Sequence, residues 1–254
     1  MKRHSLAAAA LMLGLALEIS PVTDLQAAEL RILAGGSLIG PLNELAPQFE
    51  KVSGHTLVIH FDSTPNLIKQ ATSGAPFDAA VVPVDVFKDA AAKARFVSGP
   101  TIDIARAGYG VIVRSGAPRP EVGTPEALKK TLLDAPSIAF VPESAAGAYV
   151  LKVFDRLGIA EAMKAKTMAQ TMPAQIAPAV ARGEAALGVF LMNVLIAPGV
   201  DLAGAFPAEL QQELVFSAAV AADSKQAEAA AAFVRFLITP AAAAVIKANG
   251  MTPG

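Results

Sequence analysis

The order of short apolar runs, small-residue turns and amphipathic stretches limits the fold of this chain more than any other sequence feature. Residues 30–34 (LRILA) are a short run that is apolar except for Arg31, and residues 41–52 then carry apolar side chains at helical spacing. A β-branched run at residues 56–61, a helical run at residues 66–73 and an apolar run at residues 78–84 repeat that order. This β-α-β-α-β order predicts an α/β fold with a parallel, doubly wound sheet, whose ligands bind at the carboxyl ends of the strands.

A second unit of the same kind follows the first. The pattern predicts strands at residues 109–113, 137–141, 186–191 and 214–221, and helices at residues 148–157, 176–182 and 227–237, with a last helix after Thr239 and Pro240. We therefore predict two doubly wound α/β lobes, one formed by residues 29–105 plus 216–254 and the other by residues 106–215. The junctions at residues 103–108 and 210–216 are where strands would cross between the lobes.

Residues 1–28 have the three-part layout of a secretory signal. Residues 1–4 are basic, residues 6–17 are an uninterrupted run of Ala, Leu, Met and Gly, and Glu18 ends that run. The run is too short to span a bilayer, which needs about 20 apolar residues. We expect cleavage near Glu29 and export of the mature protein.

Composition excludes several classes of function. The 254-residue chain is 54% hydrophobic and 17% charged, so it is expected to fold. A formal net charge of -1 gives no cationic surface for a phosphate backbone, and we expect no nucleic-acid partner. Because the chain has no cysteine and only three histidines, one of them His4 in the predicted signal, we expect no metal site and no cofactor.

Three turns join a strand end to a helix start and carry small or hydroxylated residues. They are residues 35–37, which include Gly36 and Ser37, the pair Ser63 and Thr64, and residues 144–147, which include Ala146 and Gly147. Such turns offer backbone N–H groups, hydroxyl groups and the positive end of a helix dipole, which together hold an anion without cationic side chains. The alternative is that Ser37 and Thr64 only cap their helices. Because three such turns occur in one chain of two lobes, we favour a cleft that binds a small anion.

Enzyme motifs are incomplete in this sequence, and we expect no catalytic activity. The stretch at residues 36–39 lacks the second glycine of a hydrolase nucleophile elbow, and no histidine follows His60. His60 and Asp62 fall on one face of a strand beside Ser63, so a hydroxyl–imidazole–carboxylate cluster is conceivable there. An exported serine hydrolase that uses Ser37 or Ser63 is therefore kept as an alternative.

Short motifs along the whole mature chain carry a family resemblance. They are residues 33–38 (LAGGSL), 61–64 (FDST), 74–78 (GAPFD), 142–147 (PESAAG) and 182–185 (RGEA). In this order they resemble the periplasmic molybdate-binding proteins of bacterial ABC importers. The resemblance implies a type II periplasmic binding protein, in which two hinged lobes close over a molybdate or tungstate ion and deliver it to a membrane permease. We expect the protein to be a monomer.

The resemblance also carries over the positions that bind the ligand. Ser37 matches the first hydroxyl of the family, Thr64 the second, and Ala146 the amide at a helix start. The loop amide of the family falls near Pro173, which has no N–H, and its tyrosine falls on Leu191. The candidate ligand-binding residues are therefore Gly36, Ser37, Ser63, Thr64, Ala146, Gly147 and Leu191. Because Pro173, Phe190 and Leu191 form an apolar wall, a small organic acid on the same scaffold is the main alternative ligand.

Overall fold

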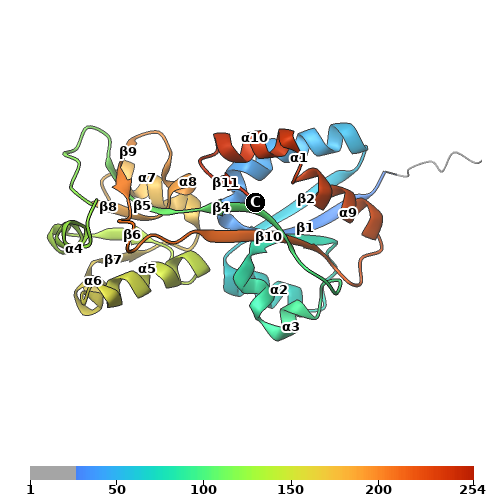
Figure 1. The fold of residues 1–254 in the computed structure, drawn as a ribbon, viewed down its shortest axis with the longest axis horizontal. Helices are drawn as coiled ribbons and strands as arrows, with labels where there is room; N and C mark the ends of the chain where they lie inside the picture. The colour runs from blue at the N-terminus through green and yellow to red at the C-terminus, as the bar shows by residue number, and fades with distance from the viewer. Residues whose placement is uncertain (1–26) are drawn as a thin grey trace, which may run out of the picture.

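A computed structural model describes residues 27–254 (Figure 1). The predicted signal at residues 1–28 lies almost wholly outside the described residues. Two sheets stand side by side along the long axis of the molecule, and helices flank both faces of each. The predicted α/β class with two lobes is therefore confirmed.

The first sheet has six strands in the order β11-β4-β10-β3-β1-β2. These strands are β1 (Glu29–Gly35), β2 (Thr56–Asp62), β3 (Ala79–Pro83), β4 (Ile102–Ala107), β10 (Leu214–Val220) and β11 (Thr252–Pro253). The helices around them are η1 (Gly36–Leu38), α1 (Ile39–Ser53), α2 (Thr64–Thr72), η2 (Val84–Lys88), α3 (Ala90–Lys93), α9 (Ala227–Phe236) and α10 (Pro240–Ala248). Helices α1, α9 and α10 lie on one side of this sheet and α2 and α3 on the other (Figure 1).

The second sheet has five strands in the order β7-β6-β8-β5-β9. These strands are β5 (Tyr109–Arg114), β6 (Ile138–Phe140), β7 (Thr167–Ala169), β8 (Leu187–Leu191) and β9 (Val200–Ala205). Its helices are α4 (Pro125–Asp134), α5 (Ala145–Arg156), α6 (Ala160–Lys166), η3 (Pro173–Gln175), α7 (Ile176–Ala181) and α8 (Met192–Leu195). Among residues 27–254 no single helix is long and apolar enough to cross a membrane, and only α9 and α10 together, bent by 61°, reach that length and composition.

The two sheets are mixed, whereas the sequence pattern predicted parallel pairing. Strand β1 pairs in parallel with β2 and β3, and β6 pairs in parallel with β7 and β8, as expected for strand–helix–strand units. Strand β10 is antiparallel to β3 and β4, and β5 is antiparallel to β8 and β9. Strands β10 and β5 enter a sheet directly from the other lobe, so they run against the strands built by local crossovers. The short β11 is also antiparallel to β4.

Two long connections join the lobes through β4 and β10. These strands pair with each other, and the fully buried Ser217 on β10 donates a hydrogen bond of 2.8 Å to the Asp103 carboxylate on β4. After β4 the chain continues through Gly108 into β5 of the second lobe. The Gln211 side chain accepts from the Tyr109 N–H at 2.8 Å and donates to the Tyr109 carbonyl at 2.9 Å, which ties the two connections together.

Close packing in the second lobe explains a glycine inside strand β8. Gly188 pairs with Ile112 on β5 and with Ala139 on β6. A Cβ atom at this position would lie 2.7 Å from Cγ1 of Ile112 and 2.9 Å from Cγ2 of Ile176 on α7. The absence of a side chain here lets α7 lie directly on the sheet.

We predict that Gly188→Ala lowers the free energy of unfolding by about 1–3 kcal/mol, because an extra methyl group overfills a packed core. Gly123→Ala is the matched control, since no atom of the described residues lies within 4 Å of the position of its Cβ. Urea unfolding of both variants measures the difference. An unchanged Gly188→Ala variant would mean that Ile112 and Ile176 move aside without cost.

Candidate functional site

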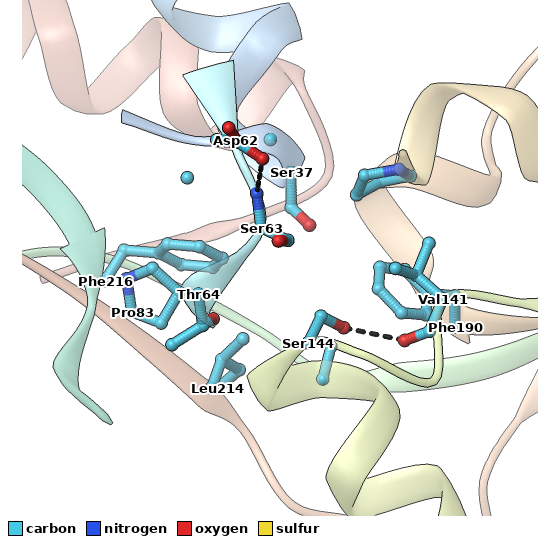
Figure 2. Close-up of a pocket in the computed structure, with 14 residues that line it drawn as sticks. Ser37, Asp62, Ser63, Thr64, Pro83, Val141, Ser144, Phe190, Leu214 and Phe216 are labelled. Atoms are coloured by element: carbon cyan, nitrogen blue, oxygen red, sulfur yellow. Dashed lines mark hydrogen bonds between the residues drawn. The ribbon is translucent and has the colours of Figure 1, made fainter. Parts of the chain in front are cut away.

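A small cavity lies between the two lobes, where the carboxyl ends of β1 and β2 face the start of α5 (Figure 2). Its lining comes from both lobes: Gly35, Gly36, Ser37, Asp62, Ser63, Thr64, Pro83, Val141, Ser144, Ala146, Pro173, Phe190, Leu214 and Phe216. The space within it that is open to the centre of a water molecule is about 20 Å³. The structure thus brings together five of the seven predicted site residues, while Gly147 and Leu191 do not line this cavity.

Three hydroxyl groups of the first lobe border the cavity. Ser37 lies in η1 directly after β1, and Ser63 and Thr64 lie where β2 passes into α2. Figure 2 shows the hydroxyl groups of Ser37 and Ser63 turned toward the same open space. Neither hydroxyl makes a hydrogen bond with another described residue, so each keeps its proton available for a ligand.

The capping alternative for Ser37 and Thr64 is wrong. The starts of α1 and α2 carry no side-chain capping hydrogen bond. The Thr64 hydroxyl instead accepts a 3.2 Å hydrogen bond from the Ala145 N–H across the cleft. Because this bond uses a lone pair of the Thr64 oxygen, the hydroxyl proton stays available to a ligand.

The start of α5 supplies one backbone donor from the second lobe. Ser144 caps this helix, because its hydroxyl accepts from the Gly147 N–H at 2.9 Å and donates to the Val141 carbonyl at 2.8 Å. The Ala145 N–H is bound to Thr64, which leaves the N–H of Ala146 as the donor of this turn without an acceptor among residues 27–254. Ala146 lines the cavity, so its N–H can reach a ligand there. The Ser144 hydroxyl cannot donate to a ligand, because its proton already bonds to the Val141 carbonyl.

Among the described residues that line the cavity, Asp62 is the only one with a titratable side chain, and both oxygens of its carboxylate are hydrogen-bonded. It accepts hydrogen bonds from the Ser63 N–H at 2.7 Å, Asn66 at 2.8 Å and Gln70 at 3.0 Å, and His60 lies 3.4 Å away. Burial alone would raise the pKa of Asp62, but the hydrogen bonds from Asn66 and Ser63 and the nearby His60 outweigh it and lower the pKa. Figure 2 shows the carboxylate turned toward the Ser63 amide and away from the hydroxyl groups of the cavity.

The contacts of Asp62 also show whether Ser63 could act as the nucleophile of a hydrolase. His60 and Asp62 do lie together, as their alternation on the strand suggested. The Ser63 hydroxyl is not hydrogen-bonded to either of them, and only the Ser63 backbone N–H reaches Asp62. Among the described residues, the hydroxyl–imidazole–carboxylate cluster is therefore not assembled at Ser63.

Apolar side chains form the rest of the wall. They are Pro83, Val141, Pro173, Phe190, Leu214 and Phe216. Sequence reasoning identified Pro173 and Phe190 but missed the contributions of β3 and β10, because no motif marks an apolar residue that meets a cavity only after the lobes come together. Leu191, which follows Phe190 in the chain, is fully buried at the start of α8 and does not line the cavity. Within residues 27–254 no cluster of three or more His, Asp or Glu side chains could hold a metal ion.

Comparison with known proteins gives the family. The model of the family described as bacterial extracellular solute-binding protein matches residues 30–252. The chain belongs to this family. Its cleft between two lobes, with hydrogen-bond donors on both sides, is the place where a solute-binding protein of this architecture would hold its solute.

Named relatives of this solute-binding protein fall into two groups. The chain is 31% identical over 245 residues to a Pseudomonas protein named aconitate isomerase, covering 93% of this chain and 90% of that protein. It is 30% identical over 231 residues to the molybdate-binding protein ModA of Azotobacter vinelandii, covering 89% of this chain and 90% of that protein. Among solved structures, the periplasmic molybdate-binding protein of Azotobacter vinelandii has the same fold, with a TM-score of 0.74, 22% identity, and coverage of 88% of this chain and 98% of that one.

We predict that Asp62→Asn lowers the free energy of unfolding at pH 7 by less than about 1 kcal/mol, since the carboxylate is partly solvated. The folded-state pKa of Asp62 is lowered, so its stabilisation is present above the unfolded pKa of about 4 and is lost as the pH falls through the folded-state pKa. The difference between wild type and variant should therefore narrow in acid. Urea unfolding between pH 7 and pH 3 measures this difference, and Asp155→Asn, at an exposed position, is the control. A difference in free energy of unfolding that grows in acid would contradict a lowered pKa of Asp62.

Proposed function

We propose that this solute-binding protein captures a small tetrahedral oxyanion of the molybdate or tungstate type and delivers it to the membrane permease of an ABC importer. The observation that carries the proposal is the set of four donors with free protons around one cavity: the hydroxyls of Ser37, Ser63 and Thr64, and the N–H of Ala146. Neutral donors at strand ends and at a helix N-terminus suit an anion without a cationic side chain. Relatives named molybdate-binding proteins support the same ligand class.

The size of the cavity also favours a compact ligand. A sphere of about 20 Å³ has a radius of about 1.7 Å, and the radius of a water molecule, about 1.4 Å, extends this to about 3.1 Å. That is room for one central atom surrounded by oxygen atoms. The apolar wall keeps water away from such an ion and strengthens each hydrogen bond to it.

A small organic acid is the second candidate, and one relative favours it. The Pseudomonas protein named aconitate isomerase is as similar to this chain as the molybdate-binding proteins are. A six-carbon tricarboxylate would require the lobes to stand further apart than they do here. Isomerisation would also require a base that removes a proton from carbon, and the lowered pKa of Asp62 makes it a weak base. We therefore propose binding rather than catalysis.

The route to the periplasm is part of the proposal. The predicted signal at residues 1–28 would export the protein and be removed near Glu29. The mature chain would then act as a monomer, presenting its closed form to the permease.

A ligand panel tests the proposal directly. Thermal-shift measurements with molybdate, tungstate, sulfate, phosphate, cis-aconitate and trans-aconitate should give the largest stabilisation with molybdate or tungstate. Stabilisation by an aconitate alone would favour the second candidate, and interconversion of the two aconitates would reveal an enzyme. A fluorophosphonate probe tests the serine hydrolase and should leave Ser37 and Ser63 unlabelled.

We predict that Ser37→Ala weakens molybdate binding by at least about tenfold, because a hydrogen bond to a charged group contributes about 1.5–3 kcal/mol. The fold should be unaffected, since the Ser37 hydroxyl makes no hydrogen bond with any residue that the structure describes. Calorimetry measures the affinity, and Ser98→Ala, at an exposed loop position, is the control. Equal affinity of the Ser37→Ala variant and wild type would remove Ser37 from the site.

We also predict that molybdate closes the lobes. A ligand bound to both lobes makes contacts that only the closed form offers, so it shifts the equilibrium toward that form. Small-angle scattering should show a smaller radius of gyration with saturating molybdate, and a Ser37→Ala, Thr64→Val double variant should stay open. An identical radius with molybdate demonstrably bound would favour a rigid site on one lobe.

A further inference from the structure

One side chain of the second lobe reaches across the cleft to the residue that carries the first candidate hydroxyl. Asn193 lies in α8, directly after β8. Its side-chain Nδ2 donates a 2.8 Å hydrogen bond to the backbone carbonyl of Ser37, 156 residues away in the chain. Asn193 does not line the cavity, so it reaches the site only through Ser37.

The contact holds the peptide unit that presents the Ser37 hydroxyl. Ser37 lies in η1, a short 3-10 helix with no side-chain cap. Fixing its carbonyl from the other lobe fixes the direction of the whole residue, and therefore of the hydroxyl that faces the cavity. Closure is tight at this point, because a Cβ on Gly36 would lie 3.1 Å from both Met172 and Pro173.

The oxygen atom of the Asn193 carboxamide limits the stability of the closed form. The Oδ1 atom of Asn193 is buried, and no donor among the described residues reaches it. A Cβ on Gly250 would lie 3.6 Å from the Asn193 Cα, so the C-terminal turn packs against this residue as well. A buried acceptor without a donor carries a desolvation cost, which water removes when the lobes part.

We propose that Asn193 is a positioning residue that latches the lobes closed over the bound ion. This inference rests on the proposed function. Its Nδ2–H favours closure and orients Ser37, while its unpartnered Oδ1 disfavours closure, so that the empty protein reopens. The latch therefore acts mainly on the rate at which the ligand leaves, since the hydrogen bond forms only after the lobes meet.

Three variants separate a latch from a merely structural residue. Asn193→Asp keeps the shape but replaces the donor with an acceptor that repels the Ser37 carbonyl, and Asn193→Ala removes both ends of the carboxamide. Asn249→Ala is the matched control, because among residues 27–254 the Asn249 side chain bonds only to Glu44 and Val245, both in the first lobe. The chain has no cysteine, so a dye pair on Lys51→Cys and Lys129→Cys, at exposed positions of α1 and α4, reports the distance between the lobes.

Stopped-flow mixing with molybdate gives the two rate constants. We expect Asn193→Asp to raise the dissociation rate at least about tenfold and Asn193→Ala at least about threefold, with association rates within about threefold of wild type. Asn249→Ala should leave both rates unchanged. The latch proposal would be wrong if both Asn193 variants released molybdate at the wild-type rate, or if the variants lowered only the association rate.

Failure of the latch proposal can be distinguished from failure of the oxyanion-binding proposal. If wild type does not bind molybdate, the oxyanion proposal fails, and the same rates are measured with trans-aconitate. If neither binds, electron-spin distance measurements on the empty protein, with labels at the same two positions, compare the closed populations. A smaller closed population in Asn193→Asp than in wild type supports the latch, and equal populations overturn it.

Discussion

The hydrogen bond from the Ala145 N–H to the Thr64 hydroxyl is the contact on which the site depends. It joins the start of α5 to the start of α2 at 3.2 Å, and so brings donors of two separate sheets around one cavity. By occupying the first amide of α5 and a lone pair of Thr64, it leaves the Ala146 N–H and the Thr64 proton for a ligand. Among the described residues the lining has no cationic side chain, and its one carboxylate, Asp62, accepts hydrogen bonds from Ser63, Asn66 and Gln70.

Any movement of one lobe relative to the other is confined by the fold to two connections. Strands β4 and β10 pair with each other, and Gln211 is bonded to both backbone groups of Tyr109 where the chain enters the second lobe. Rotation about these connections would break the Thr64–Ala145 and Asn193–Ser37 bonds together, since both cross the cleft. Opening of the lobes would therefore also free the Ser37 carbonyl from its partner in the second lobe.

The relatives show why the scaffold alone does not name the ligand. Proteins named for molybdate binding and for aconitate isomerisation are about equally similar to this chain over most of its length. What distinguishes the two possibilities is local: the space between the lobes, the protons that remain free, and the basicity of Asp62. Each of these properties depends on a few side chains, and the percentage of identical residues over the whole chain does not reveal them.

Local sequence patterns determined the strand–turn–helix order and placed Ser37, Ser63, Thr64 and Ala146 at strand ends and helix starts. Periodicity and small residues at turns act over a few neighbouring residues, so one sequence is enough to read them. Tertiary structure decided which groups kept a free proton, made Ser144 a cap, turned β5 and β10 antiparallel, and brought Asn193 to Ser37. Those outcomes depend on contacts between residues up to 156 positions apart, and no local pattern encodes which of them meet when the two lobes come together.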